Sequence, residues 1–86
     1  MASYRVEVRR PAERDLSRLQ RATLFRVWST IRSLEDNPLP RGSVKLAGSV
    51  NEYRLRVGVY RILYEVDHSS RQVTVFRVAH RREAYR

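Results

Sequence analysis

The chain has 86 residues, enough for one small domain with a single core, and its lack of cysteine excludes disulfides and thiolate metal sites. Its 18 lysines and arginines outnumber nine acidic residues, giving a formal net charge of +9, and Lys45 is the only lysine. Arginine suits planar phosphate recognition, so we expect a polyanionic partner, first of all nucleic acid. The chain has neither a signal-peptide run nor ~20 consecutive apolar residues, so we expect a cytoplasmic protein with no membrane partner.

The first half of the chain predicts one strand followed by two helices. Residues 3–9 alternate apolar and charged side chains with the period of a half-buried strand. Pro11 suits the first turn of a short helix, after which apolar residues recur at helical spacing. A longer helix, from about residue 21 to residue 35, carries Trp28 on its apolar face. We expect this side chain to anchor the core.

The second half predicts four strands: a weak one at residues 43–46, a hairpin of residues 53–57 and 60–66 around Gly58-Val59, and a final strand at residues 72–79. The final strand has apolar residues on both faces, which favours a central position. We therefore expect one α+β domain spanning residues 1–86, in the order β-α-α-β-β-β-β. Two helices should pack on one face of a mostly antiparallel sheet.

The predicted hairpin concentrates arginines on one face of the sheet. In its sequence, YRLRVGVYRILYEV, Arg54 and Arg56 alternate with apolar residues, and Arg61 can join them from the second strand. Such a row is either a solvated strand face or an anion-binding surface. The final strand runs into HRREAYR, and we expect this basic segment to fold beside the arginines and to bring one imidazole and one phenol with it.

The sequence offers no pattern for a metal or a cofactor. The carboxylates are scattered along the chain, the two histidines, His68 and His80, lack ligand spacing, and the three glycines are isolated. We therefore expect no cofactor and no metal site. What remains is metal-free cleavage of RNA, in which the 2′-hydroxyl attacks the neighbouring phosphate and arginines stabilise the developing charge. A base and an acid are needed, and the candidates are His80, Tyr85, Lys45 and the arginines.

The hairpin and the terminal segment together resemble the RelE branch of the RelE/ParE toxin superfamily, the toxic halves of bacterial toxin–antitoxin pairs. The resemblance spans nearly the whole chain. It implies a sheet whose first and last strands are parallel. It also implies a type II toxin that cleaves messenger RNA in the A site of the ribosome and so inhibits translation. Its partners would be the ribosome, messenger RNA and a cognate antitoxin that neutralises it.

The resemblance also implies roles for individual residues. Arg61 matches the arginine that stabilises the phosphate, Arg81 the arginine assigned to protonation of the leaving group, and Tyr85 the tyrosine that supports catalysis or stacks on the base. The general base stays open between two residues. His80 has an imidazole, whose ordinary pKa suits proton transfer near neutrality, and Tyr85 could act as the base if surrounding arginines lower the pKa of its phenol. The expected RNA-binding residues are Lys45, Arg54, Arg56, Arg77, Arg82 and Arg86.

Two other functions remain open. Members of the ParE branch share the fold and inhibit DNA gyrase without cleaving RNA, and they generally lack the arginine and tyrosine set found here. A non-catalytic RNA-binding or ribosome-binding module would need the same basic face without a placed acid and base. The terminal Tyr85 favours the nuclease.

Overall fold

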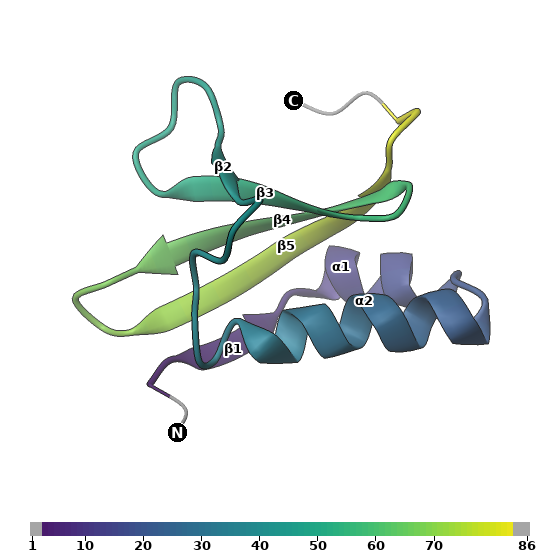
Figure 1. Cartoon of the computed structure of the whole chain (residues 1–86), viewed down its shortest axis with the longest axis horizontal. Helices are drawn as coiled ribbons and strands as arrows, with labels where there is room; N and C mark the ends of the chain where they lie inside the picture. The colour runs from purple at the N-terminus through teal and green to yellow at the C-terminus, as the bar shows by residue number, and fades with distance from the viewer. Residues whose placement is uncertain (1–2, 84–86) are drawn as a thin grey trace.

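The computed structural model describes residues 3–83, which form two helices and a five-stranded sheet (Figure 1). The elements are β1 (Arg5–Val8), α1 (Arg10–Ser17), α2 (Arg21–Ser33), β2 (Val44–Lys45), β3 (Glu52–Val57), β4 (Tyr60–Asp67) and β5 (Gln72–His80). The strands lie in the order β1-β5-β4-β3-β2, with β1 parallel to β5 and the other neighbours antiparallel. The structure thus confirms the predicted α+β order, the mostly antiparallel sheet and the parallel pairing of the first strand of the chain with the last.

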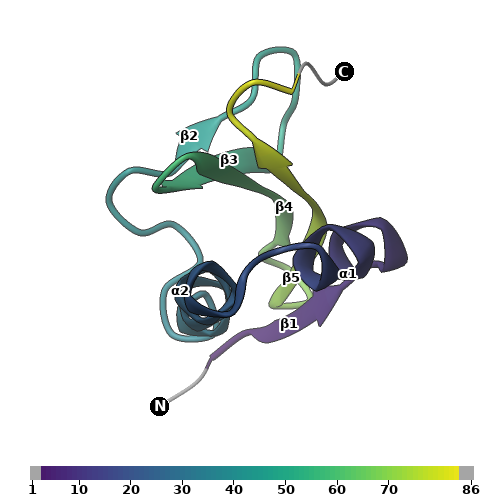
Figure 2. The same cartoon turned by 90° about the vertical axis from the view of Figure 1, so that its right-hand side faces the viewer.

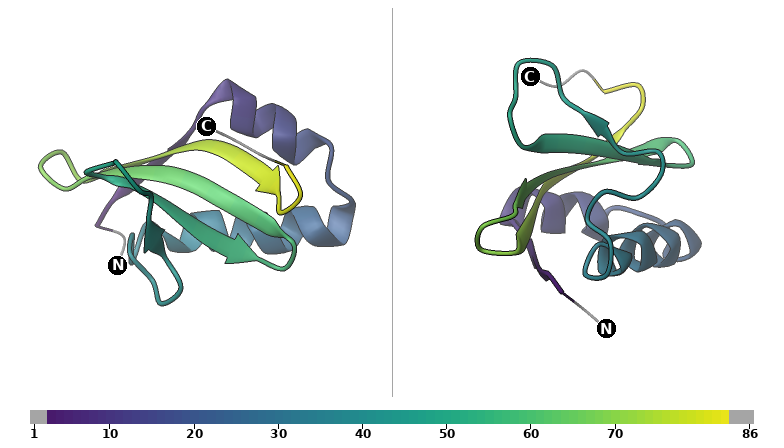
Figure 3. Two further views of the ribbon diagram at one scale, coloured as in Figure 1. Left: turned by 90° about the horizontal axis from the view of Figure 1, so that it is seen from above. Right: turned by 60° about the vertical axis from the view of Figure 1, so that its left-hand side comes forward.

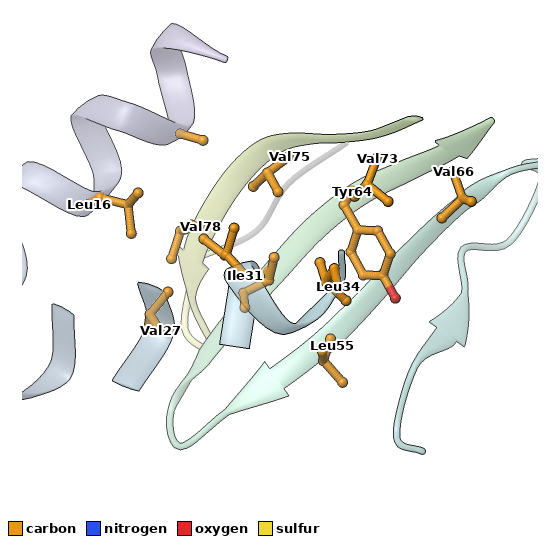
Figure 4. Close-up of a cluster of buried hydrophobic side chains, with 12 residues drawn as sticks. Leu16, Val27, Ile31, Leu34, Leu55, Tyr64, Val66, Val73, Val75 and Val78 are labelled. Atoms are coloured by element: carbon orange, nitrogen blue, oxygen red, sulfur yellow. The ribbon is translucent and has the colours of Figure 1, made fainter. Parts of the chain in front are cut away.

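Both helices cover the same face of the sheet (Figure 1), and their buried residues belong to one core cluster. Val27 and Ile31 of α2 and Leu34, the residue that caps the end of this helix, follow one another at helical spacing and are fully buried. They pack against Tyr64 of β4 and the valines of β5, as Figure 4 shows, and Ile62 of β4 belongs to the same cluster. Burial of each large apolar side chain contributes about 1.5–3 kcal/mol, so this layer fixes the helices on the sheet.

Tyr64 ties the connection between α2 and β2 to the sheet. Its ring is fully buried, and its hydroxyl donates a hydrogen bond to the Pro38 carbonyl at 2.8 Å. Desolvation raises the pKa of Tyr64 to about 12. A second bond, from the Ser43 N–H to the Pro40 carbonyl at 3.0 Å, closes the turn that contains Arg41. The connection is therefore held in place at both ends.

The expectation that Trp28 anchors the core is wrong. Its side chain is 40% exposed and that of Phe25 is 72% exposed. The sheet covers only the narrow stripe centred on Val27 and Ile31, so an indole one position round the helix lies at the edge of the contact. Within residues 3–83, neither α1 nor α2 combines the length and the apolar character needed to cross a membrane.

A β-bulge explains why β5 carries apolar residues on both faces. Tyr64 pairs with Val75, but Leu63 pairs with Arg77, so Phe76 is an extra residue on β5. Val75 and Val78 therefore both face the helices although they are three positions apart. A bulge adds local twist, and beyond it β5 continues to the same end of the sheet as the β3–β4 turn (Figure 3).

Candidate functional site

Four arginines meet at the β3–β4 turn. Arg56 and Arg61 stand opposite each other on β3 and β4, and the segment after β5 adds Arg81 and Arg82. Together with Gly58, Val59 and Tyr60 they line a hollow of about 290 Å³, called here the arginine pocket. Within residues 3–83, no carboxylate lines it. Directly opposed like charges repel each other, so the pocket favours an anionic ligand.

Arg61 also has a buried hydrogen-bond donor without a partner among the described residues. The side chain is partly buried, and its buried Nε has no hydrogen-bond partner within residues 3–83. A buried donor without a partner costs roughly 1–3 kcal/mol. A phosphate oxygen would satisfy this donor and offset the charge at once.

A short turn brings Arg81 and Arg82 to the pocket. The Arg81 N–H donates to the Val59 carbonyl at 2.7 Å, which joins the end of β5 to the β3–β4 turn. The Arg82 N–H donates to Nδ1 of His80 at 3.1 Å, and the His80 N–H donates to Oε1 of Glu83 at 2.7 Å. Gly58 makes the tight β3–β4 turn possible, because its φ of 60° is disfavoured for other residues.

The structure does not bring His80 to Arg61. His80 pairs with Tyr60 across β4 and β5, and their rings meet edge to face with centroids 5.4 Å apart. Paired residues share a face, and Tyr60 packs against the core beneath the helices. His80 therefore lies on the helix side, in a separate hollow that Asp15 and Glu83 also line. In this position His80 stabilises the turn after β5 by accepting the hydrogen bond from the Arg82 N–H.

Arg54 and Lys45, two of the expected RNA-binding residues, lie on opposite faces of the sheet. Arg54 lies on the same face as Arg56, two residue pairs further from the β3–β4 turn. Lys45 is paired with Tyr53, whose ring packs toward the core, so it lies on the helix side of the sheet, away from the arginines.

Arg77 is occupied by Asp15. Its Nε and Nη2 donate to the two carboxylate oxygens at 2.7 and 3.3 Å, and the Val78 N–H donates to the same carboxylate at 2.8 Å. The hydrogen bonds to Asp15 raise the pKa of Arg77. Asp15 thereby caps the edge of β5 where β1 has ended, and Arg77 is a structural cation rather than part of the arginine pocket.

Tyr85 and Arg86 lie outside the described residues, so their predicted roles stay predictions. Within residues 3–83, no group of three or more His, Asp or Glu side chains could hold a metal ion. Sequence reasoning missed Arg26 and Arg41, which line a second hollow beside the arginine pocket. The signal for them is weak, because one lies on a helix and the other in a Pro-Arg-Gly turn, and neither belongs to the alternating strand pattern.

Comparison with known proteins gives a consistent picture. The family described as "ParE toxin of type II toxin-antitoxin system, parDE" matches residues 6–85. RelE1 of Methanocaldococcus jannaschii is 29% identical in an alignment of 86 positions, which covers 96% of this chain and 96% of that one. The toxin–antitoxin complex RelBE2 of Mycobacterium tuberculosis contains a chain of TM-score 0.81 and 32% identity, with 96% of this chain and 97% of that one covered. The RelE–RelB complex of Pyrococcus horikoshii contains a chain of TM-score 0.80 and 27% identity, with 94% of this chain and 98% of that one covered.

Proposed function

The chain belongs to the RelE/ParE toxins of type II toxin–antitoxin systems, and from this premise we propose that it is an endoribonuclease that cleaves messenger RNA in the ribosomal A site. The observation that carries the proposal is the arginine pocket. It combines four arginines, no carboxylate and a buried, unpartnered Nε on Arg61 among the described residues. Charge of this kind stabilises a phosphate most where negative charge develops in the transition state.

The proposed reaction uses the substrate's own nucleophile. The 2′-hydroxyl loses its proton to a base, its oxygen bonds to phosphorus, and the bond to the 5′-oxygen breaks as that oxygen takes up a proton. Arg61 stabilises the phosphoryl oxygens, and Arg81 acts at the leaving oxygen. We assign the base to Tyr85 and a positioning role to His80, which lies on the other face of the sheet from Arg61. The arginines supply the cationic charge, so the proposed reaction is metal-independent and needs no cofactor.

We propose that an antitoxin neutralises this chain, since the two similar structures are toxin–antitoxin complexes. The α2 apolar surface, formed by Leu24, Phe25 and Trp28, is where we expect the antitoxin to bind. Neighbouring exposed aromatics are unusual on a soluble monomer and mark protein interfaces. Arg21 borders this surface, which favours a partner segment with apolar and acidic residues.

Programmed ribosomes test the nuclease directly. The purified protein should cut messenger RNA within the A-site codon, and Arg61→Ala should slow single-turnover cleavage by ~10²-fold or more while changing ribosome affinity far less. Arg14→Ala is the matched control, because Arg14 is an exposed arginine on α1, away from the pocket.

The gyrase alternative predicts the opposite pattern. Intact messenger RNA after incubation with programmed ribosomes, together with loss of DNA supercoiling by gyrase in the presence of the protein, would remove the nuclease assignment. Equal cleavage by the wild type and the Arg61→Ala protein would remove Arg61 from the mechanism.

A further inference from the structure

A second hollow, of about 580 Å³, lies between α2 and β3 and is called here the α2–β3 groove. Arg56 and Gly58 line both this groove and the arginine pocket, so the two hollows meet at the β3–β4 turn. Arg26 from α2 and Arg41 from the connection to β2 add further positive charge, and no carboxylate from the described part of the chain lines the groove.

The groove exists because β2 is short. Its two residues pair only with Tyr53 and Arg54, so the rest of β3, from Leu55 to Val57, has no strand neighbour on its outer side. The chain between α2 and β2 loops outward past β3 (Figure 2), and its Pro40 and Arg41 line the groove without adding a strand to this edge. The turn closed by Ser43 then presents Arg41 at the margin of the groove.

Arg26 reaches the point where the two hollows meet. A Cβ atom on Gly58 would lie 3.3 Å from Nη2 of Arg26, so the guanidinium rests on the bare backbone of the β3–β4 turn. Glycine at this position therefore permits both the turn and the close approach of Arg26. Arg26 and Arg56 thus both line the groove beside the β3–β4 turn.

We propose that the α2–β3 groove and the arginine pocket form one continuous track for single-stranded RNA, in which Arg26 and Arg41 bind phosphates flanking the one that is cleaved. The identity of the ligand as messenger RNA rests on the proposed function. Six arginines line the track: Arg26, Arg41, Arg56, Arg61, Arg81 and Arg82. In contrast, the hollow beside α1 contains Asp15 and Glu83, and the one at the end of α2 contains Glu35 and Asp36. Uncompensated positive charge therefore follows a path with two ends, as a polyanion requires.

The test compares a short and a long RNA. Trinucleotide and nonanucleotide probes carrying 2′-O-methyl groups cannot be cleaved, so anisotropy reports binding alone. The Arg26→Ala/Arg41→Ala protein should bind the trinucleotide like the wild type and the nonanucleotide ~10-fold more weakly. Its slope of log affinity against log salt should fall by about 1.4, because each lost phosphate contact on a single strand contributes about 0.7.

The matched control is Arg10→Ala/Arg14→Ala, which removes the same charge from exposed positions on α1. The track would be overturned if both double variants lost the same affinity for the nonanucleotide, or if Arg26→Ala/Arg41→Ala lost affinity for both probes. Either result would mean that only the overall positive charge of the protein attracts RNA. Circular dichroism and thermal unfolding verify that the variants are folded, and Arg26→Gln repeats the test with a side chain that keeps most of the packing on Gly58.

Further arms separate other ligands. Unchanged affinity for the free nonanucleotide with reduced affinity for ribosomes lacking messenger RNA would assign the groove to ribosomal RNA and overturn the proposal. If the double variant bound RNA like the wild type but bound the antitoxin more weakly, the α2–β3 groove would be a peptide-binding groove, and the proposal would again be overturned. Cleavage of messenger RNA on the ribosome is measured separately. If the double variant loses affinity only for the longer RNA but the wild type does not cleave, the track is supported and the nuclease assignment is contradicted. If the wild type cleaves but the double variant shows no length-dependent loss of affinity, the nuclease assignment is supported and the track is contradicted.

Discussion

Arg61 and Arg77 show how neighbouring charges set the role of one residue type. Arg77 is bound by both oxygens of Asp15, which also caps β5, so its charge is neutralised within the fold. Arg61 faces Arg56 and has a buried Nε with no partner among the described residues. The first arrangement stabilises the free protein, whereas the second is stabilised by a ligand. Sequence alone places both arginines on strands and cannot separate them.

His80 gives a test at the same scale. In the positioning role, His80→Asn should slow ribosomal cleavage by ~10-fold or less, because the amide oxygen of asparagine can replace Nδ1 as the acceptor for the Arg82 N–H. His80→Ala should slow it more, since the turn loses this bond. The dependence of the cleavage rate on pH should keep its shape in both variants.

A general base gives a different result. An ordinary imidazole titrates at about pH 6.5, so removal of a catalytic histidine abolishes the acidic limb of the pH–rate profile. Loss of that limb in His80→Asn would return the base to His80 and would contradict the assignment to Tyr85.

At the scale of elements, α2 divides its apolar residues between two partners. The stripe of Val27, Ile31 and Leu34 belongs to the core, and the neighbouring Phe25 and Trp28 remain exposed. The sequence predicts the helix and its apolar face, but not how wide an arc the sheet covers, because that width depends on the distance and angle between helix and sheet. The apolar pattern of the helix therefore does not show that Trp28 lies outside the core.

Trp28 is the only tryptophan and so reports directly on the α2 apolar surface. With an antitoxin that contains no tryptophan, its emission should shift to shorter wavelength as the indole leaves water. Phe25→Ser should weaken antitoxin binding by ~10-fold or more, consistent with burial of a large side chain contributing about 1.5–3 kcal/mol.

Val50→Ser is the control for that experiment, because Val50 is an equally apolar and even more exposed side chain outside α2. Equal affinities of all three proteins, or unchanged emission of Trp28 in the complex, would place the antitoxin elsewhere. Thermal unfolding should be nearly the same for Phe25→Ser and the wild type, since Phe25 is mostly exposed before binding.

The β4–β5 hairpin marks the limit of pattern reading. Alternation correctly predicts that Ile62, Tyr64 and Val66 face the core. Beyond Val75 the alternation of β5 loses phase at Phe76, and apolar residues on both faces are the only trace of this bulge in the sequence. Periodicity gives the face of a side chain only while pairing is regular. For the same reason it could not place His80, which follows the bulge, on the opposite face from Arg61.

At the scale of the whole molecule, the net charge of +9 is unevenly distributed. One ion pair, between Arg77 and Asp15, is formed within residues 3–83. The six arginines of the track line two adjoining hollows that share Arg56 and Gly58, and no acidic residue within residues 3–83 lines either hollow. Such a field attracts polyanions over a distance of about a Debye length and orients them before contact. Composition predicts the sign of this field, and topology decides where it acts.

The parallel pairing of β1 with β5 has a consequence for the order in which the molecule assembles. It joins Arg5 to Gln72, whereas the β3–β4 and β4–β5 hairpins close over short turns. Distant contacts form late because their loop entropy must be overcome first. In refolding followed by pulsed hydrogen exchange, the amides of β4 should be protected before those of β1, and simultaneous protection would refute this sequence of events. All residues of the arginine pocket lie from β3 onward, so a partner that recognises the pocket can engage the chain while folding is still in progress.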